Sequence, residues 1–582
     1  MESVEDYFNA LIGDAWKTPD FLFWPPNAFC LSAALLQRTG AYIRLIKKWP
    51  PHFASAGKPA VDVAEWRKEM TNRGKAWWQY VNYSIEWRFK KKNPKLVANW
   101  PKVGLHPNII AAWDVIKKHR NVLVSDLIKQ KERKTHEKFW CAIFETVAAA
   151  DEASAGIGVS VGSKFENSPT PRLDYFLYAA QLKLYEDRNK GTSATLCFDI
   201  PEHLGTILPK MHTPQSGLTL RSLTHNLAFL RPSEVRVTFW SMPSSFSSSG
   251  TLHSGPSHAI NILYIPWPKK VLPNHFHPSD CRYQRMEDGF RFFTYRAETQ
   301  NRRKRATAVT KLLEAGKELV GQINGVLLPE MALQPKEAGE LAAAIHKKNP
   351  RTFLIAGEGS ASKSGKPGNN KAVFSPWRYG GTLEQSKHHR WQLDGGQIDQ
   401  YGLGSKLDPT KTWWEHIPIG SRSINLACVS ERVTMSMLIC EDLARQDPIA
   451  DVIRSIGPNL VVALLMDGPQ LSGRWPAHYA TVFADDPGSS VLTVTSIGMS
   501  SLCRPKGQTA KRTIGLWKDR LQGFREIDLP EGAEALVLTL TLRDKEEWSA
   551  DGRTDYGQST YLTLNGVHPI FTDTRSKGTG LT

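Results

Sequence analysis

Apolar residues in the first third of the chain recur at the spacing of a helix. Between residues 60 and 92, Trp66, Met70, Trp77 and Val81 follow one another at intervals near three and four, with basic residues between them. Such intervals put side chains on one face of a helix. Similar patterns predict helices over residues 31–48, 107–119, 122–149 and 172–187. The sequence therefore predicts a basic, mostly helical N-terminal domain over residues 1–190.

The pattern changes after residue 190. Residues 195–200 predict a strand, and the polar stretch 208–217 leads into a predicted helix over 218–230, so we interpret residues 191–234 as a connecting segment. From residue 235 onward, short apolar strands alternate with helices, which is typical of an α/β domain and predicts one over residues 235–570. Residues 359–371, rich in Gly, Ser, Lys and Asn, are expected to form a loop. The strands are predicted at 235–240, 260–266, 290–295, 325–328, 353–357, 432–440, 459–465, 490–496 and 535–542, and helices at 298–320 and 335–347.

Length and composition limit the class of protein. A chain of 582 residues with 41% hydrophobic residues is too long for one core, so more than one folded domain is expected. The seven cysteines are scattered without a CxxC pair, so neither a zinc ribbon nor a disulfide framework is indicated, and we expect no metal and no cofactor. The acidic start of the chain lacks an apolar leader, and no run of about 18 apolar residues follows. We therefore expect a cytoplasmic protein that does not contact a membrane.

Positive charge is concentrated in one part of the chain. The formal net charge is +17, and residues 41–140 hold 22 Lys and Arg against 8 Asp and Glu. Such a patch favours an acidic partner, either nucleic acid or an acidic protein. Eight of the 19 tryptophans lie in the same range; they would either stack on bases or form the core of a helix bundle, and their helical spacing favours the core. The candidate nucleic-acid contacts are Lys90, Lys91, Lys92, Lys117 and Lys118.

Three polar residues stand at or near the ends of predicted strands and offer complementary chemistry. Glu330 follows the strand 325–328, Lys387 lies in Ser386-Lys387-His388-His389, and Cys440 ends the strand that begins near Val433. Cleaving an unreactive C–N bond through a thioester needs a thiol, a carboxylate that moves the thiol proton, and a positive charge for the oxyanion. The alternative interpretation of Cys440 is that it is a small apolar side chain that fills the core.

The motifs around these residues resemble those of the nitrilase, or carbon–nitrogen hydrolase, superfamily. Leu327-Leu328-Pro329-Glu330, Ser386–His389 and Leu438-Ile439-Cys440-Glu441-Asp442-Leu443 carry the resemblance, which spans residues 235–565. It implies an αββα sandwich, a homodimer, and hydrolysis of an amide, carbamoyl compound or nitrile as the small-molecule substrate. It further implies that Glu330 is the general base, Lys387 the oxyanion stabiliser and Cys440 the nucleophile. Glu415 is the candidate second glutamate, with an exposed acid as the alternative, and the Glu441 N–H the second oxyanion donor.

Several features leave other functions open. The segment from Lys387 to about Pro418 is long, and Ala484-Asp485-Asp486-Pro487 departs from the Arg-x-x-Glu-Asn pattern of the family. A catalytically inactive nitrilase-like domain that binds nucleic acid or a partner, in defence against foreign genetic elements, is one alternative. The second is a polymerase palm, because residues 482–486 resemble a Phe-x-Asp-Asp turn that could hold two Mg²⁺ ions. Pro487, where a hairpin strand would continue, argues against it. Residues 473–479 are expected to flank the substrate pocket.

Overall fold

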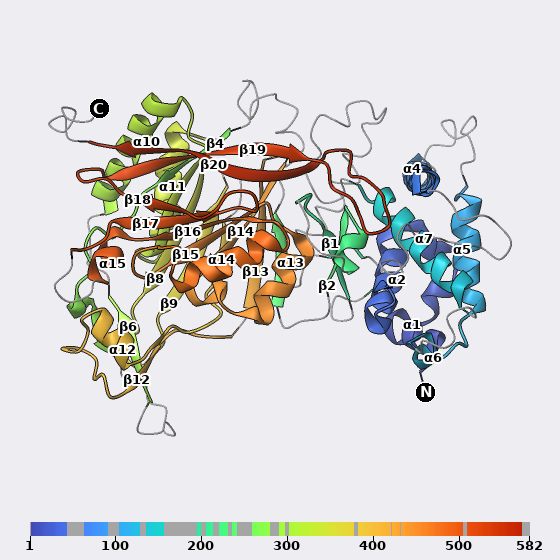
Figure 1. Ribbon diagram of the computed structural model, residues 1–582, viewed down its shortest axis with the longest axis horizontal. Helices are drawn as coiled ribbons and strands as arrows, with labels where there is room; N and C mark the ends of the chain where they lie inside the picture. Colours follow the sequence, from blue (N-terminus) through green and yellow to red (C-terminus); the bar gives the residue numbers. More distant parts are fainter. Residues whose placement is uncertain are drawn as a thin grey trace.

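The structure is a computed structural model in which a helical unit lies beside a larger unit built of sheets (Figure 1). The predicted helix over 172–187, Lys91, Lys92 and the side chain of Lys90 lie outside the described residues. The structure describes residues 2–43, 63–90, 104–128, 136–155, 195–197, 200, 205–213, 220–230, 235–240, 259–279, 290–296, 302–376, 382–420, 422–430, 432–503 and 509–572.

The N-terminal unit is helical, as predicted. Its core contains the tryptophans expected from the helical spacing, with Trp77 and Trp113 fully enclosed. The helix predicted over 31–48 ends at Thr39, because Gly40 takes a left-handed conformation at φ 65° that closes α2. The helix predicted over 122–149 is two helices, α6 and α7. The helices are α1 (Val4–Ile12), α2 (Pro25–Thr39), α4 (Val63–Lys90), α5 (Pro107–Lys118), α6 (Val124–Ile128) and α7 (Glu137–Ala153), with 3₁₀ turns at Gly13–Lys17 and Pro19–Phe23.

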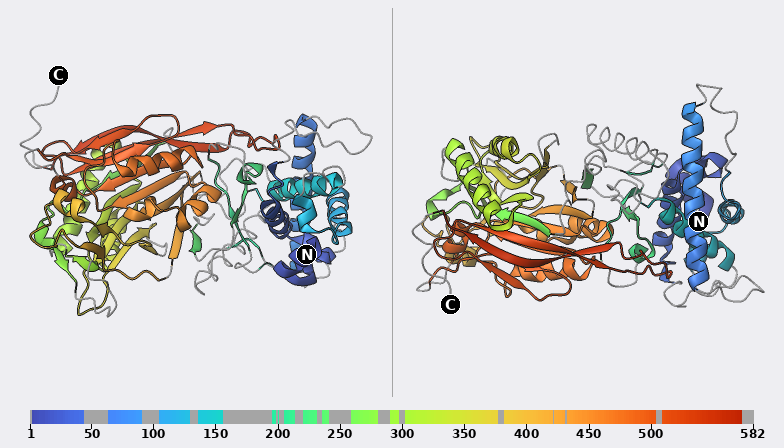
Figure 2. Two further views of the ribbon diagram at one scale, coloured as in Figure 1. Left: turned by 60° about the horizontal axis from the view of Figure 1, so that its bottom comes forward. Right: turned by 90° about the horizontal axis from the view of Figure 1, so that it is seen from above.

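A small two-stranded sheet lies between the two units (Figures 1 and 2). β1 (Thr206–Pro209) pairs antiparallel with β2 (Leu227–Leu230). Among the described residues of 218–230, the only helical element is a 3₁₀ turn at Leu220–Leu223. The helix predicted over 218–230 is therefore wrong, because the apolar residues of β2 find their partners on β1 and not along a helix. The strand predicted over 195–200 is also not formed in its described part, although Leu196 N–H donates to Ile207 O at 2.7 Å.

Two seven-stranded sheets form the larger unit. The first has the order β10-β9-β8-β7-β4-β19-β20 and the second β18-β17-β16-β15-β14-β13-β3, while a four-stranded sheet, β11-β12-β6-β5, lies beside them. The first sheet comprises β4 (Ala259–Tyr264), β7 (Gly325–Leu333), β8 (Phe353–Ser360), β9 (Asn369–Ser375), β10 (Leu383–Ser386), β19 (Ala535–Lys545) and β20 (Ser559–Ile570). The second comprises β3 (Val235–Trp240), β13 (Arg422–Ser430), β14 (Val433–Ile439), β15 (Leu460–Leu465), β16 (Ser490–Thr495), β17 (Thr513–Lys518) and β18 (Arg525–Asp528). The small sheet comprises β5 (Phe276–Pro278), β6 (Phe290–Tyr295), β11 (Gln392–Leu393) and β12 (Thr412–Glu415).

Helices cover the outer faces of both large sheets. α10 (Arg302–Val320) and α11 (Glu337–Lys348) pack on the first sheet, and α13 (Asp451–Ile456) and α14 (Trp475–Asp485) pack on the second. The inner faces of the two sheets share one apolar core, as in aligned sheet packing. This arrangement is an αββα sandwich, so the predicted fold class, with its added helical N-terminal region, is confirmed. Two shorter helices, α12 (Gly395–Gln400) and α15 (Ile497–Leu502), complete the unit.

The palm interpretation of residues 482–486 is wrong. Asp485 is the last residue of α14 and is followed by Asp486 as its C-cap, so the two acids do not lie on a hairpin. In the described ranges, no group of three or more His, Cys, Asp or Glu side chains is arranged to hold a metal ion. Within the same ranges, no helix combines the length and the apolar character that crossing a membrane requires.

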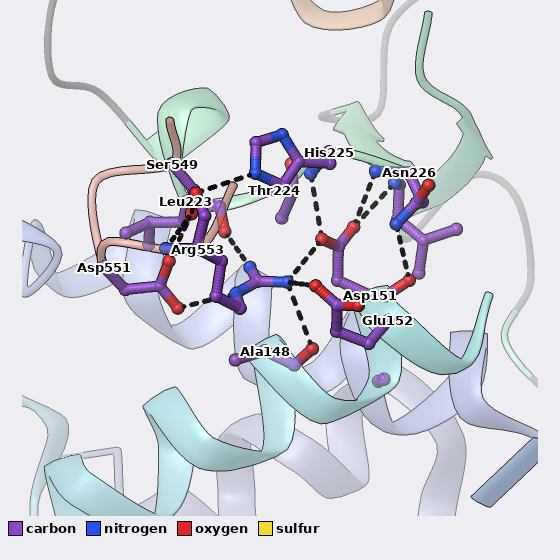
Figure 3. A network of polar contacts seen from close by, with 12 residues as sticks. Ala148, Asp151, Glu152, Leu223, Thr224, His225, Asn226, Ser549, Asp551 and Arg553 are labelled. Carbon is purple, nitrogen blue, oxygen red and sulfur yellow. Dashed lines mark hydrogen bonds and ion pairs between the residues drawn. The ribbon is translucent and has the colours of Figure 1, made fainter. Parts of the chain in front are cut away.

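A buried charge network joins the two units (Figure 3). The connection between β19 and β20 carries Arg553 to α7, where Nη1 donates to Asp151 Oδ2 at 3.0 Å and to Glu152 Oε1 at 2.8 Å. Its Nε donates to Asp551 Oδ2 at 2.9 Å and its Nη2 to Leu223 O at 2.6 Å. We call Arg553, Asp151, Glu152 and Asp551 the Arg553 cluster; it fixes the hairpin of the sheet unit to the helical unit.

Candidate active site

Glu330 sits where β7 leaves its ladder. The pairing of β7 with β8 is regular up to Leu328 and resumes only at Leu333, and Met331 has φ 56°. β8 passes very close at this point, because a Cβ on Gly357 would lie 2.4 Å from Glu330 Cα. A residue without a side chain is therefore required opposite Glu330. The glutamate points into the protein, and 3% of it is exposed.

Lys387 brings Glu330 and Glu415 together. It follows β10 directly, and its Nζ lies 3.0 Å from Glu330 Oε1 and 2.7 Å from Glu415 Oε2. Glu415 is the last residue of β12, which the parallel pairing with β6 carries to this point. Burial alone would lower the pKa of Lys387, but the two carboxylates raise it well above the ordinary lysine value. Lys387 therefore carries a fixed positive charge, and Glu415 is a buried partner of that charge, not an exposed acid.

Asn370 is a residue of this site that the sequence analysis missed. Its Nδ2 donates to Glu330 Oε1 at 2.7 Å and to Glu415 Oε1 at 2.8 Å. The loop predicted over 359–371 is shorter than expected, because β8 runs to Ser360 and β9 starts at Asn369. The alternation of Asn370, Ala372 and Phe374 on one face of a strand is the signal that could have found it. We call Glu330, Asn370, Lys387 and Glu415 the Lys387 cluster.

Cys440 is held at the end of β14 by a tight turn. It is the first residue of a one-turn 3₁₀ helix, Cys440–Leu443, and has φ 46°, a strained value for a residue with a side chain. Glu441, the second residue of that turn, has a backbone N–H with no acceptor inside the helix, because a helix leaves its first N–H groups without internal partners. The turn thus presents a thiol and a backbone donor side by side.

Asp442 ties this turn to the residues that follow Lys387. Its carboxylate accepts from His388 N–H at 3.0 Å and from His389 N–H at 3.0 Å, and it lies 2.9 Å from His389 Nδ1. Gln385 Nε2 adds a bond to Met437 O of β14 at 2.7 Å. The cysteine of the second sheet and the lysine of the first sheet are therefore held together across the inner core.

The electrostatics of the thiol reflect this proximity. Burial raises the pKa of Cys440 well above the ordinary thiol value, the Glu330 carboxylate raises it further, and Lys387 opposes both. Burial also raises the pKa of Glu330, with Lys387 lowering it and Glu415 raising it. Both Asn370 and Lys387 bind Oε1 of Glu330, while Oε2 is buried and has no hydrogen-bond partner among the residues that the structure describes. That oxygen can accept a proton from a neighbouring thiol.

The segment between Lys387 and Pro418 forms one wall of the site. It contains β11, α12 and β12, and its apolar residues Trp391 and Trp413 pack in one cluster with Met331, next to Glu330, and with Met466. The long segment from Lys387 to Pro418 is thus a built layer, not an open loop.

A second polar group, centred on Asp467, acts electrostatically on the Cys440 thiol. Asp467 accepts from Tyr401 OH at 2.5 Å and from Arg474 Nη2 at 2.6 Å. Its charge also contributes to the raised pKa of the Cys440 thiol. Arg474 belongs to the segment 473–479, which the sequence analysis expected beside the pocket.

The two candidate nucleic-acid contacts that the structure describes in full, Lys117 and Lys118, lie apart from this site, in the helical unit (Figure 1). Lys117 and Lys118 are in the last turn of α5; Lys117 Nζ is 2.8 Å from Asp114 Oδ1 and Lys118 is exposed. The tryptophans described between residues 41 and 140 are buried or half-buried, which follows the core interpretation and leaves those rings unable to stack on bases. They are Trp66, Trp77, Trp78, Trp113 and Trp140.

Among known proteins, the chain is similar to several solved structures. No protein-family profile and no curated protein sequence matches the chain. A CN-hydrolase superfamily protein from Xanthomonas campestris matches with 15% identity over 48% of this chain and 89% of its own, with a TM-score of 0.29. An amidase of the nitrilase superfamily from Nesterenkonia matches with 11% identity over 49% and 90%, with a TM-score of 0.30. A carbon–nitrogen hydrolase from Helicobacter pylori matches with 15% identity over 46% and 90%, with a TM-score of 0.29.

The three matched proteins are described as a CN-hydrolase superfamily protein, a nitrilase-superfamily amidase and a carbon–nitrogen hydrolase. The matches cover about half of this chain. Because the identities and superposition scores are low, they carry nothing about side chains. The chemistry of the site rests on the Lys387 cluster and Cys440 of this chain.

Proposed function

We propose that the protein hydrolyses a non-peptide carbon–nitrogen bond of an amide, a carbamoyl compound or a nitrile through a thioester at Cys440. The observation that carries this proposal is the division of labour on Glu330. Its Oε1 is held by Lys387 and Asn370, and its Oε2 is buried and has no hydrogen-bond partner among the described residues. A carboxylate that is fixed, desolvated and raised in pKa is suited to take a proton and return it.

For an amide, the proposed reaction proceeds in two halves. Glu330 takes the thiol proton, and the Cys440 sulfur attacks the carbonyl carbon, whose oxygen becomes an oxyanion beside the Lys387 ammonium and the Glu441 N–H. The C–N bond then breaks, Glu330 gives its proton to the leaving nitrogen, and a thioester remains. Water, deprotonated by Glu330, attacks the thioester; the acid leaves and the thiol is restored.

Glu415 and Asn370 have positioning roles in this proposal. Both oxygens of Glu415 are engaged, Oε1 by Asn370 and Oε2 by Lys387 and by Trp391 N–H at 3.2 Å. A carboxylate so fully bonded is a poor proton acceptor and a good anchor. We therefore assign Glu415 to holding the Lys387 ammonium in place, with Glu330 as the base.

The test is the covalent intermediate. Full-length protein is mixed with an activated acyl compound, p-nitrophenyl acetate, and the intact mass is recorded at short times. An acetyl adduct is expected on the native chain, absent in Cys440→Ala and retained in Cys428→Ala, whose thiol is equally buried in the sheet core. Amides, carbamoyl compounds and nitriles are then screened for ammonia release.

An adduct that persists in Cys440→Ala, or a Cys440 thiol that reacts no faster than Cys428, would sink the proposal. In that case the chain would be a binding protein with an inactive hydrolase-like domain. The predicted homodimer is a separate expectation, checked by sedimentation of the full chain.

The charge of residues 41–140 supports a second, independent role as a surface for an acidic partner. Because the described tryptophans of that range are buried or half-buried, we propose ionic contact with a polyanion and not stacking on bases. Binding to single-stranded DNA should fall steeply between 50 and 200 mM salt, on the order of 10³-fold if six phosphates are contacted. Binding that is insensitive to salt would remove this role.

A further inference from the structure

A cavity lies between the helical unit and the sheet unit. Its volume is about 310 Å³, near the lower end of the range for small-molecule sites. Its apolar walls come from α2 and the residues just after it, from the turn Leu220–Leu223 and from β2, and they include Phe29, Ala33, Tyr42, Leu220 and Phe229. The opposite wall is polar and is made by Arg221, Arg454 and Asp486.

The polar wall holds two arginines and two aspartates. Arg221 donates from Nη1 to Arg454 O and forms an ion pair from Nη2 with Asp486 Oδ1. Arg454 Nε is 3.7 Å from Asp486 Oδ2. One carboxylate therefore faces two guanidinium groups, and the other acid of the wall, Asp451, is exposed to solvent.

Arg221 also keeps an unused donor. Its Nε is buried and has no hydrogen-bond partner in the described part of the chain, whereas Arg454 Nε lies beside Asp486. Guanidinium N–H groups match the oxygens of phosphates and carboxylates in charge and geometry. A buried donor without an acceptor costs free energy that a bound anion would recover.

Lys210 lies behind this wall. It is 2% exposed, and its Nζ donates to the carbonyl oxygens of Arg221, at 2.7 Å, and of Thr224. Burial lowers the pKa of Lys210 well below the ordinary lysine value, so its side chain does not count among the charges of the wall. Burial, together with the neighbouring charge of Arg454, lowers the pKa of Arg221 to about 10. The positive charge that lines the cavity is therefore that of Arg221 and Arg454.

We propose that this cavity binds a small organic anion, a phosphate or carboxylate group carried on an apolar or aromatic body. The oxyanion would meet Arg221 and Arg454 in competition with Asp486, and the body would lie against Phe29, Tyr42 and Phe229. Leu220, Arg221 and Thr224, which belong to the stretch 191–234 interpreted from the sequence as a connecting segment, would then supply part of a binding site at the junction of the two units.

The test uses titration calorimetry of the full chain with phenyl phosphate, benzoate, inorganic phosphate and phenol. Phenyl phosphate or benzoate is expected to bind in a 1:1 ratio, with inorganic phosphate and phenol each about tenfold weaker, since each supplies half of the recognised chemistry. Arg454→Gln should weaken binding about tenfold or more, the loss typical of a hydrogen bond between charged groups. Arg302→Gln, at an exposed ion pair with Glu340, is the matched control and should leave binding unchanged.

Asp486→Asn gives the opposite sign and separates a binding site from a purely structural joint. Removing the competing carboxylate should tighten phenyl phosphate binding several-fold, whereas a joint that only holds the units together would lose stability and gain no affinity. Equal binding by the native chain and Arg454→Gln, or no binding of either aromatic anion, would overturn the proposal. If Arg454→Gln does not fold, the sign of the Asp486→Asn effect decides.

Discussion

Two buried charge clusters in this protein look alike in composition and differ in how completely they are bonded. The Lys387 cluster has one cation and two carboxylates, and the Arg553 cluster has one cation and three (Figure 3). In the Arg553 cluster, backbone N–H groups and the guanidinium occupy the carboxylate oxygens of Asp151. In the Lys387 cluster, Glu330 Oε2 has no hydrogen-bond partner among the described residues, and the Glu330 charge raises the pKa of the Cys440 thiol.

The protonation behaviour of the two clusters differs accordingly. Burial would raise the pKa of Asp151, but Arg553, His225 and the backbone donors lower it below the ordinary aspartate value. Burial raises the pKa of Glu330, and its partners do not reverse that shift. A cluster whose partners outweigh burial holds a structure together, and one whose base stays under-bonded is prepared to exchange a proton.

The largest expected effect is on catalysis, from Glu330→Gln. The amide keeps the shape of the side chain but cannot accept the thiol proton, so kcat/KM should fall by about 10²–10⁴. Ammonia release from the substrate found by screening measures it, and urea unfolding checks that the fold is retained. Glu340→Gln, at a solvent-exposed position of α11, is the control. Full activity in Glu330→Gln would show that the Lys387 cluster, like the Arg553 cluster, has a structural role and no catalytic one.

Arg553→Ala should act on stability instead. It leaves three carboxylates in or near the interior without their cation, and removing one partner of a buried ion pair costs about 3–5 kcal/mol. Urea unfolding of the full chain measures the loss, and kcat of the folded protein should stay near the native value. Arg302→Ala breaks an exposed ion pair and should cost about 0–1 kcal/mol. A loss equal to that of the control would show that the Arg553 cluster does not hold the two units.

The pH dependence separates the clusters without mutation. Glu330 must be ionised to act as base, and its raised pKa moves the acid limb of kcat/KM above the ordinary glutamate value of about 4.3. The lowered pKa of Asp151 contributes stability that is present above the unfolded value of about 3.9 and is lost as pH falls through the folded pKa. On acidification, activity should therefore decline before the fold does. The rate of substrate hydrolysis measures activity, and circular dichroism measures the folded fraction. Loss of activity and of the fold in one transition would contradict this order.

The smallest effect is expected from Asn370→Ala. This change removes the amide that bridges Glu330 and Glu415 but leaves Lys387 between them, so kcat should fall by about tenfold, as for the loss of a hydrogen bond to a charged group. Because Asn370 lowers the pKa of Glu330, its removal should also move the acid limb of the pH–rate profile to higher pH. Asn369→Ala, whose side chain is exposed, is the matched control. An unchanged pH profile would assign Asn370 a packing role only.

The sequence by itself indicated the helical N-terminal unit, about half of the described strands and four residues of the candidate site, Glu330, Lys387, Glu415 and Cys440. These are local properties: apolar spacing reports which face of an element is buried, and Glu330, Lys387 and Cys440 each stand at or near the end of a recognisable strand. The same local view took β2 for a helix, because four apolar residues look alike in either element until β1 is placed beside them. It passed over Asn370, because the alternation of Asn370, Ala372 and Phe374 begins inside the stretch 359–371, whose composition predicts a loop.

The tertiary structure alone decided which charges meet. Lys387 finds Glu415 because β12 pairs with β6, Asn370 spans two glutamates because β9 lies beside β8, and Cys440 joins them from the opposite sheet through Asp442. Arg553 likewise reaches Asp151 from 402 residues away along the chain. The physical reason is that a buried charge is stabilised by partners in space, and sheet order and register set those partners, which no local pattern of residues encodes.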